Sequence, residues 1–232
     1  MIYLDNAATS FPKPPGVAQA VYDHITQLGV SSSRGSYRAA IEVSRIAFDC
    51  REKLAEIFNI SDSSRLAFTI NATAGINTIL KGYLKKNSRV ITTSMEHNAV
   101  MRPLNYLIKE RGISVIKAGA SPKEGYLDFE DFQKKIPGAD LAVINHASNV
   151  SGAIQDIMKI GKICRREKIP LMLDAAQTAG IYPIDVEKMN ISFMAFSGHK
   201  GLMGPTGCGG FYVDPDIKID PLIHGGTGSN SE

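Results

Sequence analysis

The 232-residue sequence has no tryptophan and only three cysteines, and no apolar run approaches the ~18 residues that a membrane span needs. Its cysteines, Cys50, Cys164 and Cys208, form no Cys-x-x-Cys pair, which suggests a reducing compartment and no zinc site. The first residues carry no signal-peptide pattern. We therefore expect a cytoplasmic protein without a bound metal, in which each cysteine is a small buried hydrophobic residue.

The sequence also lacks a strong net charge and the common nucleotide-binding motifs. The net charge is only +3, and lysine and arginine form no block longer than pairs such as Lys85-Lys86, so we expect neither a nucleic-acid nor a membrane partner. No Gly-x-Gly-x-x-Gly follows a strand-like run and no P-loop lysine occurs, which argues against the common nucleotide sites. With 44% hydrophobic and 21% charged residues, the composition is that of an ordinary globular domain.

Short apolar runs alternate with helical periodicity along the chain. The spacing of apolar residues predicts helices near 17–28, 41–58, 99–111 and 157–166, and a helix-like stretch that ends near residue 83 follows the first strand-like run. Apolar runs predict seven strands near 66–70, 90–93, 114–117, 141–145, 171–173, 193–196 and 209–213. This alternation predicts an α/β domain with a mostly parallel sheet. Because the last two strands have no helix between them, one of them should run antiparallel.

A lysine stands in the glycine-rich run Ser-Gly-His-Lys-Gly-Leu-Met-Gly-Pro-Thr-Gly at residues 197–207. Ser197 and His199 flank Lys200 with a hydroxyl and an imidazole, which can both bond an anion, and the glycines let a cofactor approach the backbone. A lysine amine that condenses with an aldehyde needs such a fixed turn. Considered alone, however, a lysine in a glycine-rich turn is usually a solvated surface residue.

A carboxylate ends the apolar run Leu-Met-Leu-Asp at residues 171–174. This pattern predicts a buried strand with Asp174 at its carboxyl end, where open α/β sheets bind ligands. A carboxylate beside a pyridinium nitrogen keeps that nitrogen protonated, as pyridoxal-phosphate chemistry requires. The alternative role for Asp174 is an ordinary helix N-cap.

Three further runs place small polar residues directly after strand-like segments. The run 68–77 passes from a strand into a helix, whose first N–H groups and the Thr73 hydroxyl can attract a phosphate. His97 follows the strand at 90–93 and can stack on a flat aromatic cofactor, and Asn149 follows the strand at 141–145. Ordinary capping at Thr73 and a solvated loop position for His97 are the alternatives.

Taken in order, these motifs resemble a known family. The chain is similar to the fold type I, class V pyridoxal-phosphate enzymes, and among them to the cysteine desulfurase and selenocysteine lyase group. The resemblance spans essentially all 232 residues and rests on six motifs: Tyr-Leu-Asp-Asn-Ala-Ala-Thr at 3–9, Ala-Thr-Ala-Gly-Ile-Asn at 72–77, Glu-His-Asn-Ala at 96–99, Ser-Asn-Val-Ser-Gly at 148–152, Asp-Ala-Ala-Gln at 174–177 and Ser-Gly-His-Lys at 197–200. It implies the fold type I large domain, a mostly parallel, mixed seven-stranded sheet flanked by helices, with pyridoxal 5′-phosphate as cofactor.

The resemblance also implies residue roles. Lys200 would form the Schiff base with the cofactor and move the substrate α-proton, His97 would stack on the ring and assist proton transfer, and Asp174 would pair with the ring nitrogen. The other contacts to the phosphate and the ring hydroxyl would come from Ala72 (through its N–H), Thr73, Asn149, Gln177, Ser197, His199 and Thr227. Ala72 stands where the family often has a hydroxyl residue, so one side-chain contact is lost.

The implied reaction converts L-cysteine to L-alanine and passes the sulfur to an enzyme cysteine, from which an acceptor protein could take it. Members of this family continue well past this length, and their later segment holds that cysteine and an arginine for the substrate carboxylate. We therefore interpret 1–15 as an extended N-terminal segment and 16–232 as a cofactor-binding large domain without its small C-terminal domain. A selenocysteine lyase, an aminotransferase, an epimerase and a non-catalytic fragment are the alternatives.

Assembly is the last expectation. The resemblance implies a homodimer for the full-length protein, in which residues 223–228 reach the partner's cofactor and Thr227 adds a hydroxyl to the phosphate site. Two-fold dimers are the commonest soluble assemblies and suit two shared sites. A loose chain terminus is the alternative for this segment.

Overall fold

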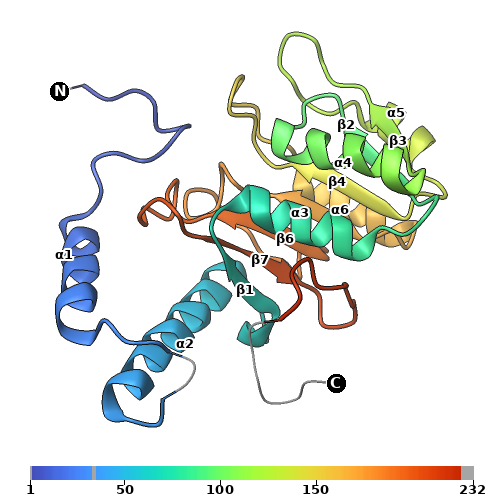
Figure 1. Ribbon diagram of the computed structural model, residues 1–232. Helices are drawn as coiled ribbons and strands as arrows, with labels where there is room; N and C mark the ends of the chain where they lie inside the picture. The colour runs from blue at the N-terminus through green and yellow to red at the C-terminus, as the bar shows by residue number, and fades with distance from the viewer. Residues whose placement is uncertain (1, 33–34, 226–232) are drawn as a thin grey trace.

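The computed structural model describes residues 2–32 and 35–225, which build one seven-stranded sheet with helices on both faces (Figure 1). All seven strands lie where the sequence predicts them. Their order across the sheet is β1-β7-β6-β5-β4-β2-β3. The strands are β1 Leu66–Thr69, β2 Arg89–Thr93, β3 Ser114–Ala118, β4 Leu141–Asn145, β5 Leu171–Asp174, β6 Phe193–Ser197 and β7 Gly209–Val213.

Strand directions place six carboxyl ends on one edge of the sheet. Strands β2 to β6 pair in parallel, whereas β7 pairs antiparallel with both β6 and β1, so β1 points the same way as the parallel strands. The prediction of one antiparallel strand is confirmed, because a loop without a helix returns the chain directly alongside β6. The edge that collects these strand ends is where ligands bind in open α/β sheets.

The sheet separates two hydrophobic cores because alternate strand residues face opposite sides. In β4, Leu141 and Val143 pack on one side with helices α3 and α4, and Ala142 and Ile144 pack on the other with α5, α6 and the end of α2. The helices are α1 Pro15–Asp23, continued by a π-helical segment His24–Leu28, then α2 Arg38–Phe58, α3 Ala72–Tyr83, α4 Asn98–Arg111, α5 Phe129–Lys135 and α6 Ile157–Arg166, with a 3₁₀ turn at Ser63–Arg65.

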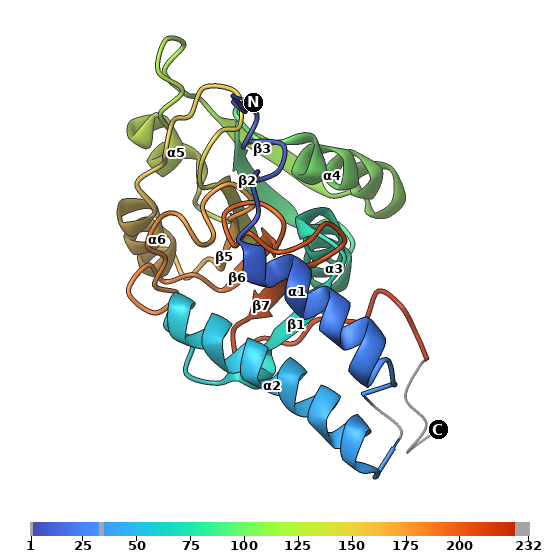
Figure 2. The ribbon, with the colours of Figure 1, turned by 90° about the vertical axis from the view of Figure 1, so that its left-hand side faces the viewer.

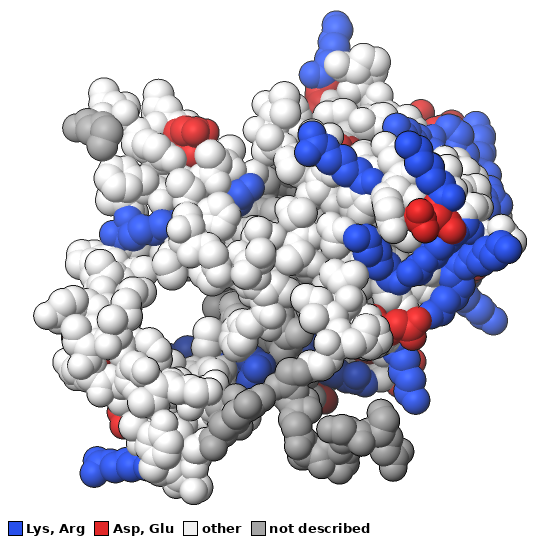
Figure 3. Space-filling view, viewed as in Figure 1, with Lys and Arg blue, Asp and Glu red and all other residues white. Residues whose placement is uncertain are grey.

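Helices α1 and α2 project away from this sandwich (Figures 1 and 2). Helix α1 has no buried residue, and α2 buries only Ala40, Ala55 and Phe58. Large apolar side chains are exposed along both helices and the segment between them, at Val21, Tyr22, Ile25, Tyr37, Ile41, Ile46, Phe48 and Ile57. Figure 3 shows this part of the surface as largely uncharged, while lysine and arginine gather over the opposite end of the molecule. Monomeric proteins rarely expose so large an apolar surface.

The cysteine prediction is wrong at two of its three positions. Cys164 is buried in α6, as expected, but Cys50 is exposed and Cys208 is only partly buried. Both line an apolar groove between α1, α2 and the lysine-bearing loop, where the Cys208 thiol donates to the Pro205 carbonyl at 2.9 Å. Helical spacing turns Cys50 toward this open groove and Phe58 toward the core, so apolar surroundings do not mean burial here.

Candidate functional site

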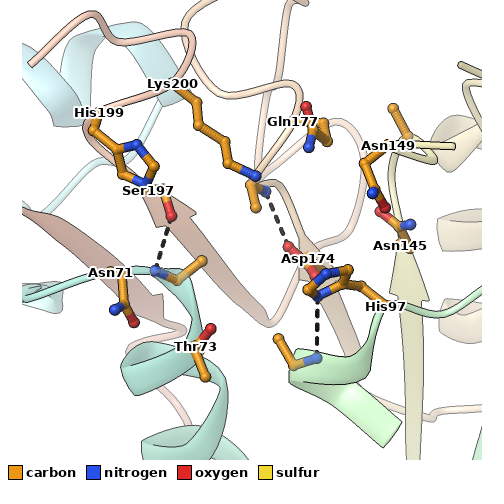
Figure 4. A pocket seen from close by; sticks show the side chains of 14 residues that line it. Asn71, Thr73, His97, Asn145, Asn149, Asp174, Gln177, Ser197, His199 and Lys200 are labelled. Atoms are coloured by element: carbon orange, nitrogen blue, oxygen red, sulfur yellow. Dashed lines mark hydrogen bonds between the residues drawn. The ribbon is translucent and has the colours of Figure 1, made fainter. Parts of the chain in front are cut away.

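A cavity of about 180 Å³ opens at the carboxyl edge of the sheet (Figure 4). Nine of the ten predicted site residues line it, and the tenth, Thr227, lies outside the described residues. The lining comprises Asn71, Ala72, Thr73, His97, Ala99, Asn145, Ala147, Asn149, Asp174, Ala176, Gln177, Ser197, His199 and Lys200. Segments more than 100 residues apart in the chain therefore meet at one point.

Lys200 extends into the middle of the cavity from the loop after β6 (Figure 4). Backbone bonds close this loop tightly: Met203 N–H donates to the Lys200 carbonyl at 2.9 Å and Gly204 N–H to the Gly198 carbonyl at 2.7 Å. A Cβ on Gly201 would stand 2.4 Å from the Ala179 carbonyl oxygen, so only glycine fits there. Burial lowers the pKa of the Lys200 amine, and the Asp174 carboxylate opposes that shift. A lowered pKa leaves more of the amine neutral and nucleophilic.

Asp174 ends β5 and is 3% exposed. Burial raises the pKa of this carboxyl, while the Ala176 N–H, His97 and Lys200 counteract the rise. Its Oδ1 accepts from Ala176 N at 3.0 Å, which caps a turn; the alternative of a helix N-cap is wrong, because no helix lies between β5 and β6. A buried carboxylate favours a cationic partner that enters the cavity beside it.

The opposite side of the cavity is built for an anion. Helix α3 begins here, with Asn71 as its N-cap: Asn71 Oδ1 accepts from Ala74 N at 2.9 Å. Ala72 N–H donates to Ser197 Oγ at 3.1 Å, and Thr73 and His199 lie beside them (Figure 4). The start of a twelve-residue helix carries partial positive charge and N–H donors, which suits a phosphate.

His97 caps helix α4. Its Nδ1 accepts from Ala99 N at 3.1 Å, so the proton of the neutral ring is on Nε2. The side chain nevertheless lines the cavity beside Asp174 (Figure 4), and capping therefore fixes the ring in place. Gln177 and Asn149 lie at the far rim, and Gln177 Nε2 donates to the Ala7 carbonyl at 3.0 Å.

Sequence reasoning missed Glu96, a half-buried residue whose carboxyl group is buried beside the cavity-lining Asn145. Its Oε1 accepts from Thr93 Oγ1 at 2.7 Å and from Asn145 N at 3.1 Å, so it joins the ends of β2 and β4. Among the described residues Oε2 has no hydrogen-bond partner. Burial raises the pKa of Glu96 to about 8, and the Asp174 charge adds to the rise. The Glu-His-Asn-Ala motif contains this residue, but only the packing of β2 against β4 shows its burial.

A second unpredicted group is His146, at the end of β4. It is buried, its Nδ1 lies 2.9 Å from Thr178 Oγ1, and its ring meets that of Tyr182 edge-on. Burial lowers the pKa of His146 to about 4. A neutral histidine with these partners is a packing element beside the cavity.

Fold and site together define a class of protein. A sheet enzyme with a lysine between a buried carboxylate and a helix N-terminus matches the needs of a phosphorylated aromatic aldehyde, whose three functional groups would face these three elements. The chain belongs to the aminotransferase class-V family, whose sequence model matches residues 2–231.

Known proteins agree with this assignment. The chain is 36% identical to a probable cysteine desulfurase from Pyrococcus abyssi, over 98% of its own length, and 36% identical to cysteine desulfurase IscS from Vibrio campbellii, over 97%. A solved apo structure of a cysteine desulfurase from Thermococcus onnurineus NA1 superposes with a TM-score of 0.92 at 32% identity and covers 97% of the chain. The sequence aligns to about 57% of each of these proteins.

The described residues offer neither a membrane-spanning helix nor a cluster of metal ligands. No helix among them is both long and apolar enough to cross a membrane. No cluster of three or more histidine, cysteine, aspartate or glutamate side chains in this part of the chain could hold a metal ion.

Proposed function

We propose that this chain binds pyridoxal 5′-phosphate through Lys200 and forms the cofactor domain of a cysteine desulfurase. One observation carries the proposal: Lys200, Asp174 and the start of α3 face a single cavity. The donor set fits the cofactor at both ends, because a buried carboxylate suits the ring nitrogen and helix N–H groups suit the phosphate.

The residues take distinct roles in this proposal. Asp174 pairs with the ring nitrogen, and His97 lies against the ring. The phosphate is held by Ala72 N–H, Thr73, Ser197 and His199, and the ring hydroxyl by Gln177 and Asn149. When bound, the cofactor supplies an electron sink for the substrate's α-carbon. Lys200 accepts and returns the α-proton, for which its lowered pKa prepares it.

The proposed substrate is L-cysteine, which becomes L-alanine while its sulfur passes to a cysteine thiol. Similarity to proteins named cysteine desulfurase supports this choice, as does a similar structure described as SspA in complex with cysteine, with a TM-score of 0.89 and 30% identity. None of the chain's three cysteines lines the cavity. Burial also raises the pKa of Cys164 to about 12, which keeps that thiol unreactive at neutral pH.

We therefore propose that the sulfur-accepting cysteine and the carboxylate-binding arginine belong to a segment outside these 232 residues. The chain as given would bind the cofactor without completing the reaction. An acceptor protein for the sulfur belongs to the same proposal. The three unpaired thiols support a reducing, cytoplasmic setting.

A homodimer is proposed for the full-length protein. Two features support a dimer. Apolar side chains are exposed along α1 and α2, and these helices form an apolar groove with the lysine-bearing loop. This surface adjoins the loop that carries Lys200, so a partner there would lie close to the site. Light scattering on the full-length protein tests this, since a fully active monomer would contradict a shared site.

The role of Asp174 gives the test of cofactor binding. Asp174→Asn keeps the shape and removes the charge that faces the ring nitrogen. A charge-assisted hydrogen bond contributes roughly 1.5–3 kcal/mol, so we expect the dissociation constant of pyridoxal phosphate to rise about ten- to hundredfold. Titration of the apo chain, followed by visible absorbance, measures it.

The matched control for this variant is Asp156→Asn. Asp156 caps α6, where its Oδ1 accepts from Lys159 N at 3.0 Å, and it does not line the cavity. The control variant loses the charge of a capping carboxylate, as Asp174→Asn does, but it loses no contact with the cofactor. Equal affinities for wild type, Asp174→Asn and Asp156→Asn would reduce Asp174 to a capping residue and remove the main support for the proposed function.

A further inference from the structure

The backbone carbonyl directly before Lys200 is held by the N-terminal segment. The His199 oxygen accepts from Thr9 Oγ1 at 2.9 Å, from Ser10 N and Oγ at 3.2 Å each, and from Lys13 Nζ at 2.5 Å. A carbonyl oxygen has two lone pairs, so four donors share them. The bond from the Lys13 ammonium is the shortest of the four, and Lys13 is the one charged donor among them. Hydrogen bonds from a charged donor are stronger than those between neutral groups.

Lys13 is itself fixed by the same segment. Its Nζ lies 2.7 Å from Ser10 Oγ and 3.5 Å from Thr9 Oγ1, and the side chain is half-buried. Thr9 Oγ1 also lies 3.1 Å from His199 Nδ1, so one hydroxyl contacts both the backbone and the ring of His199. Pro14 and Pro15 follow Lys13 and restrict the chain as it enters α1.

The rest of the N-terminal segment is held by contacts within itself and by one bond from Gln177. Tyr3 donates its hydroxyl to the carbonyls of Asp5 and Thr9, at 3.0 Å each, and its ring packs edge-on against Phe11. The Ala7 carbonyl accepts from Gln177. Figure 2 shows this segment, in dark blue, crossing the loops at the site edge of the sheet. The segment thus ties the loop that carries Lys200 to the loop that carries Gln177.

We propose that Lys13, together with Thr9 and Ser10, is a positioning residue that holds the Lys200 turn in its binding conformation. The proposal rests on the proposed function, because it assigns Lys13 to the lysine that would bind the cofactor. Lys13 does not line the cavity, so it would act through the His199 carbonyl and not by contact with cofactor or substrate.

Hydrogen–deuterium exchange on the apo chain tests the clamp without any cofactor. The amides to follow are those of Met203 and Gly204, whose bonds close the lysine turn. Lys13→Met keeps the length of the side chain and removes its charge and donors. We expect these amides to exchange about tenfold faster in Lys13→Met, the size of effect that one lost charge-assisted bond gives. Lys13→Arg restores cation and donors and should exchange as wild type does.

Lys135→Met is the matched control. Lys135 Nζ donates to the Lys117 carbonyl at 3.0 Å and pairs with Asp131, beside the edge strand β3, which three strands separate from β6. This variant should leave exchange in the lysine turn unchanged. The cofactor affinity of the apo chain gives a second readout, and we expect it to fall about tenfold in Lys13→Met and to recover in Lys13→Arg.

The outcomes separate this inference from the proposed function. Wild-type exchange at Met203 and Gly204 in Lys13→Met overturns the clamp, even if the cofactor binds to Lys200. Faster exchange throughout the chain also overturns it, because that pattern shows a general loss of stability. If the turn loosens selectively but the wild-type chain binds no pyridoxal phosphate, the clamp stands and the proposed function fails.

Discussion

Replacing Lys200 with alanine should abolish the covalent attachment of pyridoxal phosphate and its visible absorbance. The amine is the group that condenses with the aldehyde, and alanine offers no nucleophile in its place. Lys200 is only half-buried, so the far-ultraviolet circular dichroism spectrum should stay that of wild type. Phosphate and ring contacts remain, and the variant should therefore still bind the cofactor weakly and reversibly.

Lys188→Ala is the control for this experiment. Lys188 forms an exposed ion pair with Asp185 and is not part of the cavity, so its loss should leave the absorbance unchanged. Absorbance spectra before and after gel filtration distinguish covalent from reversible binding. Covalent cofactor in Lys200→Ala at the wild-type level would show that another lysine carries it.

The second large effect concerns Glu96 and the pH dependence of stability. Burial raises the pKa of this carboxyl from 4.5 to about 8 in the folded chain, so the folded state keeps a proton that the unfolded state has released. The stabilisation that the protonated Glu96 carboxyl contributes is fully present below pH 4.5, and it is lost as the pH rises toward 8. At about 1.4 kcal/mol per pH unit, the free energy of unfolding should fall by about 2 kcal/mol between pH 6.5 and 8.

Glu96→Gln should remove this fall. The amide cannot ionise, and its oxygen can still accept from Thr93 and from the Asn145 N–H. Urea unfolding of the apo chain at several pH values measures the effect, as the difference between wild type and variant. The comparison starts at pH 6.5 because His146 also affects stability below that pH. Its pKa falls from the usual 6.5 to about 4 in the folded chain, so His146 makes the free energy of unfolding rise with pH between these values.

Glu110→Gln, which alters an exposed glutamate of α4, is the control and should follow the wild-type curve. Parallel curves for wild type and Glu96→Gln would mean that Glu96 is ionised in the folded chain. The difference between the two curves also cancels the contributions of Asp174 and Lys200, whose pKa values are shifted in both proteins.

Much of this fold follows from local sequence patterns. All seven strands contain short runs of apolar residues, and burial on both faces explains why the first four residues of β4 are all apolar. The antiparallel β7 follows from the missing helix after β6. Helix α5 escaped prediction because seven residues give too little periodicity, although Asp128 caps it through the N–H groups of Glu130 and Asp131.

The cavity lining was predictable because each of the five motifs that line it follows a strand that ends at the same edge of the sheet. Contacts between distant segments were not predictable. The burial of Glu96 depends on the packing of β2 against β4, and the bond from Lys13 to His199 joins residues 186 positions apart. The exposure of Cys50 likewise depends on how α2 stands away from the sheet.

Borohydride reduction of the chain with bound pyridoxal phosphate, followed by proteolysis and mass spectrometry, tests the central claim most directly. Reduction makes the link between amine and cofactor permanent, so the modified residue can be read from the peptide masses. Binding through Lys200 predicts that the added cofactor mass falls on the peptide that contains Lys200. Cofactor mass on a different lysine, or none on any peptide, would contradict it.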